Sequence, residues 1–321
     1  MISRTVLVGF VKVGVSLACL LAIWRMFSPA NWSDLIARMD PMLAISAVAV
    51  LLVGQVANGY RHWAVLFGLG RALPAGRVVA LASAGMFFNQ VLPSGMGGDV
   101  VRVVHLQRRC GWKRSTASVL FDRISGVSLN LAVVAVLLPF YYRMPIPDQA
   151  KVAITLLAAG PLLGLAVGLL VARHAWLRRM LPRPFRLGLY GLILLRRLVR
   201  PAVLIRLALP VLGGFFPYVA CFGLIGESLG GGVGPLGYLL MVPLIFIAVQ
   251  IPVSFGGWGI REGAAVALMP LVGMDSGVAL LTSFLFGAAV LVTSLPGLAV
   301  WLLGGLADAD VRPASSIPGA S

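Results

Sequence analysis

The sequence is poor in charge, in acidic residues above all, and in cysteine and histidine. Charged residues make up 11% of the 321-residue chain, with ten acids against 26 lysines and arginines, whereas 60% of residues are apolar and the mean hydropathy is +0.98. Soluble domains carry about 25% charged residues, while a bilayer span requires about 20 uncharged residues. This composition excludes a soluble domain and predicts an all-α integral membrane protein, a polytopic helical bundle.

The cysteines and histidines are too few and too scattered for a redox or metal centre. The three cysteines are odd in number and widely separated, so they offer neither a disulfide framework nor a CxxC site. Each histidine is near arginines at an expected span end, which favours an interfacial role for His62, His105 and His174. No His–carboxylate cluster is present, so we expect no metal, no cofactor and no catalytic residues.

The net charge of +16 is distributed by loop rather than gathered in one nucleic-acid-binding patch. The segments 102–114 and 173–200 are strongly basic, and no acid occurs from 149 to 226. The remaining loops carry five of the ten acids and only two arginines: 28–41, 143–148, 227–235 and 273–276. Lysine and arginine concentrate on cytoplasmic loops, so the alternation predicts topology, with attraction to anionic headgroups as a second role. We expect a bacterial inner-membrane protein with both termini cytoplasmic and no nucleic-acid partner.

Apolar runs between the charged loops predict six full spans and two broken segments. The spans are expected near 8–27, 42–60, 117–140, 152–172, 204–225 and 277–303. The basic segment 173–200 is typical of a helix lying at the interface. One transmembrane domain over 1–306 follows, with halves at about 1–140 and 150–306, and a disordered tail over 307–321.

The two broken segments, 78–106 and 235–273, do not fit as ordinary spans. Both sides of 78–106 are basic, so both ends are expected inside, and the stretch PSGMGG stands where a hairpin would turn. The legs of 235–273 have about 16 residues each, short of the 20 or so needed to cross. We therefore predict two re-entrant helical hairpins, one entering from each side.

The breaks share one spacing. Pro93-x3-Gly97-Gly98-x3-Arg102 matches Pro252-x3-Gly256-Gly257-x3-Arg261. Opposed broken helices in two halves are typical of inverted-repeat transporters, whose sites lie at the repeat interface. Because glycine and proline are common in membrane helices, coincidence is the alternative. The matched arginine favours a true inverted repeat, with the two hairpin tips facing one polar cavity.

The residues of the breaks suggest an anion site. Proline ends the first leg, and paired glycines permit a tight reversal. The helix restarting at Gly98 or Gly257 would point free N–H groups at an anion, and Arg102 and Arg261 could hold a phosphate bidentately. Asp99 and Glu262 would cap these helices or balance the arginines; mutual neutralisation of each acid–arginine pair is the alternative.

Further polar residues flank the breaks. Asn89, Gln90 and Gln250 precede the prolines and would bond frayed carbonyl groups. The pair Asp122–Arg123 is either interfacial or, being near the first hairpin, part of the site, whereas Asn130 is expected to serve helix packing. The candidate substrate-binding residues are Asn89, Pro93, Ser94, Gly97, Gly98, Asp99, Arg102, Asp122, Arg123, Gln250, Pro252, Ser254, Gly256, Gly257, Arg261 and Glu262.

At these residues the chain resembles the lysylphosphatidylglycerol synthase transmembrane family, also called flippase-like or UPF0104. The first motif, N-x-x-L-P-x-x-x-G-G-D/E-x-x-R, is met from Asn89 to Arg102; Asp122–Arg123 matches a following E/D-R, and P-x-S-x-G-G-x-G-x-R-E is met from Pro252 to Glu262. Phe255 replaces a proline common before the glycines. The resemblance covers about 5–305 and implies lipid movement between leaflets, without the aminoacyl-transferase domain.

Three function classes follow. The resemblance favours a translocase for an anionic lipid or a polyprenyl-phosphate-linked glycan. A membrane transferase acting on a polyprenyl phosphate is the second, although the sequence has no DDxxD-type array. The third is a non-transporting partner that holds a glycosyltransferase or lipid synthase at the membrane.

Overall fold

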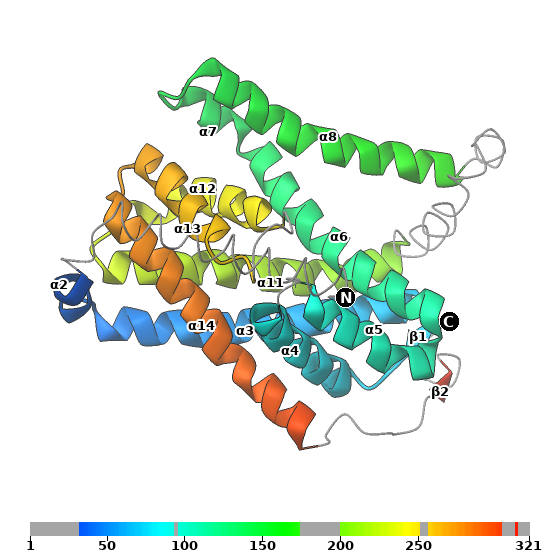
Figure 1. Ribbon diagram of the computed structural model, residues 1–321. Coiled ribbons are helices and arrows are strands. Elements are labelled where there is room, and N and C mark those ends of the chain that lie inside the picture. Colours follow the sequence, from blue (N-terminus) through cyan, green and yellow to red (C-terminus); the bar gives the residue numbers. More distant parts are fainter. Residues whose placement is uncertain (1–31, 93–95, 174–199, 251–255, 304–311, 314–321) are drawn as a thin grey trace, which may run out of the picture.

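A computed structural model shows an elongated bundle of helices (Figure 1) and describes residues 32–92, 96–173, 200–250, 256–303 and 312–313. The elements are α2 (Trp32–Ala37), α3 (Pro41–Gly68), β1 (Arg71–Ala72), α4 (Ala75–Val91), α5 (Gly97–Cys110), α6 (Trp112–Val136), α7 (Leu138–Arg143), α8 (Asp148–Arg173), α11 (Pro201–Ser228), α12 (Gly234–Val249), α13 (Ile260–Leu268), the 3₁₀ helix Met269–Val272, α14 (Ser276–Leu302) and β2 (Arg312–Pro313). The two short strands pair antiparallel. The all-α fold class is confirmed.

Five helices are long and apolar enough to cross a membrane, by length and composition: α3, α6, α8 over its first 21 residues, α11 and α14. They correspond one to one with the last five predicted spans. The first predicted span, 8–27, the interfacial segment and most of the tail lie outside the described residues. Along α8, Leu156 and Leu163 are each 66% exposed, as expected of apolar side chains that face lipid.

Helix α3 is longer than predicted, and this changes the place of one arginine. The helix starts at a capped end, where the Asp40 carboxylate accepts from the N–H of Met42 at 2.8 Å. It continues to Gly68, so Arg61 and His62 lie inside the helix and not beyond its end, as the predicted span of 42–60 implied. The sequence boundary at residue 60 was wrong because charge was taken as the end of the span.

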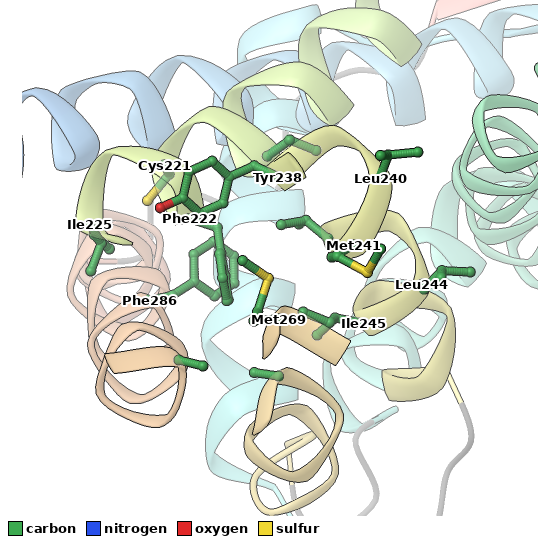
Figure 2. Close-up of a cluster of buried hydrophobic side chains, with 14 of the residues drawn as sticks. Cys221, Phe222, Ile225, Tyr238, Leu240, Met241, Leu244, Ile245, Met269 and Phe286 are labelled. Carbon is green, nitrogen blue, oxygen red and sulfur yellow. The ribbon is translucent and has the colours of Figure 1, made fainter. Parts of the chain in front are cut away.

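Helices α3 and α11 pack antiparallel along most of their lengths (Figure 1). The Asp40 N–H at the start of α3 donates to the Ser228 carbonyl at the end of α11, at 3.1 Å. The largest apolar core lies between α11, α12, the 3₁₀ helix and α14, where Phe222, Met269 and Phe286 meet (Figure 2). This core anchors the second broken segment against two full-length helices.

The first broken segment forms a helical hairpin. Helices α4 and α5 pack against each other, and a Cβ added to Gly98 would lie 1.7 Å from the Gly85 carbonyl oxygen. Their far ends also lie together, because Arg77 and Arg109 line one small pocket. The hairpin shape agrees with the prediction, and its entry into a membrane stays a prediction.

The second broken segment folds back in the same way. Helix α12 packs against α13 and the 3₁₀ helix, and a Cβ at Gly237 would lie 3.4 Å from the Val272 Cβ at the far ends. The tips of the two hairpins meet: a Cβ at Gly256 would lie 2.9 Å from the Gln90 carbonyl oxygen. This meeting is what the inverted-repeat hypothesis predicts.

The packing of the helices shows the correspondence expected of a repeat. Exchanging α3 with α11, α4 with α12, α5 with α13 and α6 with α14 maps the α3–α11 pair onto itself and every other extensively packed pair among these helices onto another such pair. Within the halves, α3–α4 corresponds to α11–α12 and α5–α6 to α13–α14. Between the halves, α6 packs on α12 as α14 packs on α4. The antiparallel α3–α11 pair relates the two halves in opposite directions, which supports an inverted repeat.

The hairpin topology has a direct labelling test. Ala75 and Arg108 lie at the two ends of the first hairpin that are far from its tip. We expect single cysteines at these positions to react with an impermeant maleimide from the same, cytoplasmic side. A cysteine at the exposed Asp148 should react only from the opposite side. The background protein carries alanine in place of its three native cysteines. Labelling of positions 75 and 108 from opposite sides would show that this segment crosses the membrane.

Candidate functional site

A cavity of about 310 Å³ lies where the two hairpin tips meet the long helices. Most of the lining helices contribute residues about one turn apart, so one face of each points inward. On α6 these include Arg123, Val127 and Asn130, and on α11 they include Gly214 and Tyr218. Helices α3, α4, α5, α12, α13 and α14 complete the wall.

A chain of five alternating charges forms one part of this wall. Arg102 on α5 donates through Nη2 to Asp99 at 2.5 Å and through Nη1 to Asp122 of α6 at 2.8 Å. Asp122 also accepts from Nε of Arg61 on α3 at 2.8 Å, and Asp99 accepts from Nε of Arg123. Two carboxylates therefore hold three guanidinium groups together and leave this cluster with an excess positive charge.

The centre of the charge chain is buried, which makes its internal pairing essential. Arg102 is 7% exposed, Asp99 6% and Asp122 3%. Charges this deep are costly unless they are paired and hydrogen-bonded. Asp122 binds Arg61 and Arg102, and Arg123 binds Asp99, so the Asp122–Arg123 pair is part of the charge chain and is not self-contained.

His62 belongs to the same cluster, and its interpretation as an interfacial histidine was wrong. The side chain is fully buried, with Nδ1 3.4 Å from Nη1 of Arg102 and Nε2 3.3 Å from the Ser118 hydroxyl. The Ser118 hydroxyl donates in turn to the Ser115 carbonyl. Because that hydroxyl proton is used, Nε2 is the natural donor to Ser118. The imidazole ring of His62, on α3, thus contacts the Arg102 guanidinium through Nδ1 and helps to hold it in place.

Arg261 supplies the charge from the second hairpin. Its Nη2 and Nε lie 2.7 and 3.1 Å from Oε1 of Glu262, and Nε lies 3.3 Å from the Ser283 hydroxyl of α14. Its guanidinium also lies 4.7 Å from the Trp258 ring centroid, within cation–π range. The acid–arginine pairs that the sequence offered as an alternative, Asp99–Arg102 and Arg261–Glu262, are both present. Arg102 and Arg261 nevertheless line one cavity.

Glu262 also caps its helix, as predicted. Its Oε2 accepts from the Gly259 N–H at 2.6 Å at the start of α13. Asp99, by contrast, binds arginines and caps nothing in the described structure. Asn89 accepts from the Gly98 N–H at 2.8 Å, tying the two legs together, whereas the sequence predicted a bond to frayed carbonyls.

The paired glycines serve different purposes in the two hairpins. Gly98 has no unusual φ and instead permits the contact between α4 and α5. Gly256 and Gly257 have φ of +56° and +84°, a conformation that only glycine adopts readily. The matched spacing therefore does not mean matched local geometry: α5 restarts at Gly97, but α13 restarts only at Ile260.

Several backbone N–H groups after the glycines already have acceptors within the protein. The Gly98 N–H donates to Asn89, and those of Asp99 and Val100 donate to the Met96 carbonyl. In the second hairpin the Gly259 N–H donates to Glu262. At the first hairpin, therefore, the guanidinium groups offer the cationic contacts to the cavity, and an anion site at the second helix start stays a prediction.

The structure gathers seven of the predicted site residues around one cavity: Asn89, Asp99, Arg102, Asp122, Arg123, Gln250 and Arg261. Five others lie behind the wall and support it: Gly97, Gly98, Gly256, Gly257 and Glu262. Pro93, Ser94, Pro252 and Ser254 lie outside the described residues. Substrate contact by any of these residues stays a prediction.

Sequence reasoning missed several cavity residues, chiefly Asn58, Arg61, Asn130 and Tyr218. The stretch "VANGYRHW" in α3 places three polar side chains, Asn58, Arg61 and His62, within five residues of an apolar helix. Polar side chains clustered in this way in an apolar span indicate an intramembrane site. Asn130 stands seven residues after Arg123, two helical turns along the same face. Tyr218 has no such signal. Among the described residues no group of three or more His, Cys, Asp or Glu forms a metal site.

Comparison with known protein families finds a match over nearly the whole chain. The family described as Lysylphosphatidylglycerol synthase TM region matches residues 9–297, nearly the whole chain, and includes both broken-helix motifs and the Asp122–Arg123 pair. No curated protein matches the chain. The matched region contains every residue that lines the cavity.

Proposed function

Because the chain belongs to the lysylphosphatidylglycerol synthase transmembrane family, a family of lipid-related membrane proteins with a flippase-like role, we propose that it is a lipid translocase. Its substrate is an anionic lipid or lipid-linked glycan of a bacterial inner membrane. The phosphate of the headgroup binds in the cavity between the two broken segments. The protein moves lipid between leaflets without chemical change, so it is not an enzyme.

The observation that carries this proposal is the charge that lines one cavity. Four arginines line it, namely Arg61, Arg102, Arg123 and Arg261, and they contact three carboxylates, those of Asp99, Asp122 and Glu262. The balance is one positive charge in a bundle whose outer helices are apolar. Intramembrane charge is costly and typically marks a substrate path. A phosphate would supply the missing negative charge and accept from guanidinium groups.

The hairpins explain how such a site can open. Irregular backbone at membrane depth requires burial in protein or a watery cavity, and both breaks lie against this cavity. Transporters of inverted-repeat design move one repeat against the other around a site at their interface. Here Arg102 comes from the first repeat and Arg261 from the second, so relative movement of the repeats changes which leaflet the site faces.

Purified protein in liposomes tests the activity. We expect a fluorescent phosphatidylglycerol in the inner leaflet to become accessible to external dithionite in protein-containing liposomes and to stay protected in empty ones. The assay is run with and without an imposed pH gradient or membrane potential, since the energy source is part of the question. If the inner-leaflet lipid in protein-containing liposomes stays protected from dithionite under all these conditions, the proposal is contradicted.

A membrane partner or transferase working with a glycosyltransferase or lipid synthase makes a different prediction in cells. Leaflet-resolved lipid labelling in a strain lacking the protein separates the two. A translocase changes the sidedness of its lipid and leaves the total unchanged. A transferase or a scaffold for a synthase changes the total amount.

A further inference from the structure

The central arginine of the charge chain is engaged before any lipid binds. Nη1 of Arg102 donates to Asp122 at 2.8 Å and lies 3.4 Å from Nδ1 of His62, and Nη2 donates to Asp99. Nε of Arg102 is buried, so a bidentate contact with a phosphate in the cavity has to use Nη1 and Nη2 together. Because both N–H groups of Nη1 face acceptors, such a contact requires that one of these acceptors be released.

The two acceptors at Nη1 differ in what their release costs. Asp122 is a buried carboxylate, and separating it from Arg102 would leave buried charge without full compensation. His62 is a neutral ring in this contact, because Nε2 donates to Ser118 and Nδ1 is left to accept. Loss of His62 as an acceptor breaks no ion pair, so it is the partner that Arg102 can give up.

Protonation of His62 would release this donor. An imidazolium ring donates from both nitrogens, so it keeps Ser118 at Nε2 but no longer accepts from Arg102 at Nδ1. It also places a positive charge beside the guanidinium, across the 3.4 Å contact. Both changes free Nη1 of Arg102 for a ligand in the cavity that this arginine lines.

The charges around His62 are balanced, so a ligand can decide its protonation. Four charged side chains act on the ring: Arg61 of its own helix, Asp99 and Arg102 of α5, and Asp122 of α6. Two are positive and two are negative, and each acid is held by arginines. A lipid phosphate at Arg102 would add a negative charge, which favours the protonated ring.

The other helices packed on α3 bring no further charge to this ring. Helix α14 has no titratable residue. Arg77 of α4 lines the separate pocket at the far end of the first hairpin, and Arg206 of α11 lies over the Phe67 ring. Histidine is the side chain whose ordinary titration falls between about pH 5 and pH 8. His62 is therefore the member of this cluster best suited to exchange a proton during transport.

We propose that His62 is a proton-binding site coupled to the lipid site, so that the protein carries a proton together with the anionic lipid. The neutral ring holds an N–H group of Arg102 in the empty cavity, and the protonated ring leaves this donor to the phosphate. The proton comes from water on the side to which the cavity is open and returns to water when the lipid leaves. This inference rests on the proposed function and adds the coupling ion.

Calorimetric titration of the detergent-purified protein measures this coupling. The probe is dioctanoyl phosphatidylglycerol, a phosphodiester whose single negative charge does not change over the range used. Titrations at one pH in two buffers of different ionisation enthalpy give the number of protons taken up per lipid. We expect net proton uptake, and an affinity about tenfold higher at about pH 6 than at about pH 8, because coupling between two sites is reciprocal and typically of this size.

The variant His62→Asn separates protonation from packing. Its amide oxygen can accept from Arg102 where Nδ1 does, but an amide binds no proton in this range. We expect lipid binding to persist without proton uptake and with less than about a twofold change in affinity between the two pH values. His62→Gln, which can keep the Ser118 contact, is the second variant in case the first folds poorly. The matched control is His105→Asn, which removes an imidazole that lines the separate pocket and should keep the proton uptake of the wild type.

Liposomes test the same coupling across a membrane. We expect an imposed pH gradient to change the rate at which inner-leaflet fluorescent phosphatidylglycerol becomes accessible to dithionite in the wild type and in His105→Asn. The same gradient should have no effect in His62→Asn. A purely structural role of His62 would change the rate without removing its response to the gradient.

The outcomes separate this inference from the proposed function. Lipid binding by the wild type that is independent of pH and takes up no proton would overturn the inference and keep the phosphate site, whether or not the variants fold. Proton uptake retained in both His62 variants, or lost in His105→Asn, would also overturn it. Absence of lipid binding at both pH values would instead overturn the proposed function.

Discussion

Arg102→Gln should lower the rate of anionic lipid translocation about a hundredfold. Arg102 is the central group of the charge chain, held at once by Asp99 and Asp122, and a hydrogen bond to a charged group contributes about 1.5–3 kcal/mol. Arg102→Lys should also impair transport, because an ammonium keeps the charge but lacks the planar fork that spans two carboxylates. The liposome dithionite assay measures both variants.

Loss of folding must be separated from loss of transport. Removing one partner of a buried ion pair costs about 3–5 kcal/mol, and Arg102→Gln leaves Asp99 and Asp122 with less compensation. The double variant Asp99→Asn/Arg102→Gln removes a matching negative charge and should recover stability without recovering transport. Wild-type stability with wild-type transport in that double variant would eliminate Arg102 as a phosphate contact.

Arg261 provides a second check of the same mechanism. If one phosphate is held by both arginines, the effects of Arg102→Gln and Arg261→Gln on transport should be strongly non-additive. The Arg261 variant is best paired with Glu262→Gln, since these side chains contact each other at 2.7 Å. Wild-type rates in the well-folded variant lacking both arginines would contradict a phosphate clamp.

Gly98→Ala should destabilise the protein by about 3–5 kcal/mol, a large effect for the addition of one methyl group. The new Cβ would lie 1.7 Å from the Gly85 carbonyl oxygen and 2.5 Å from its carbon. These are backbone atoms, so the clash can be relieved only by separating α4 from α5. That separation would also displace Asp99 and Arg102, which follow directly in α5.

The matched control is Gly164→Ala in α8. No atom lies within 4 Å of the added Cβ, and alanine is the better helix former, so its stability should equal or slightly exceed that of the wild type. Thermal unfolding in detergent, followed by size-exclusion chromatography, compares the two variants. Equal midpoints for Gly98→Ala and Gly164→Ala would show that the close contact of α4 and α5 does not stabilise the protein.

The helices and their breaks could be predicted from the sequence, because a bilayer imposes requirements on each segment of the chain separately. Apolar runs of about 20 residues predicted the five spans that the structure describes after residue 40, and the proline–glycine motifs predicted where helices stop. In lipid a backbone break without protein cover is too costly to occur. Arg102 and Arg261 were found for the same reason, since both follow directly on such breaks.

The partners of these arginines depend instead on how distant helices meet. Asp122 binds Arg61, 61 positions away, and Arg102, 20 positions away, while its sequence neighbour Arg123 binds Asp99. The burial of His62, Asn58 and Asn130 and the cavity itself follow from the packing of α3, α6 and α11. No local pattern specifies them, because charge pairing depends on distances in space that only the packed bundle establishes.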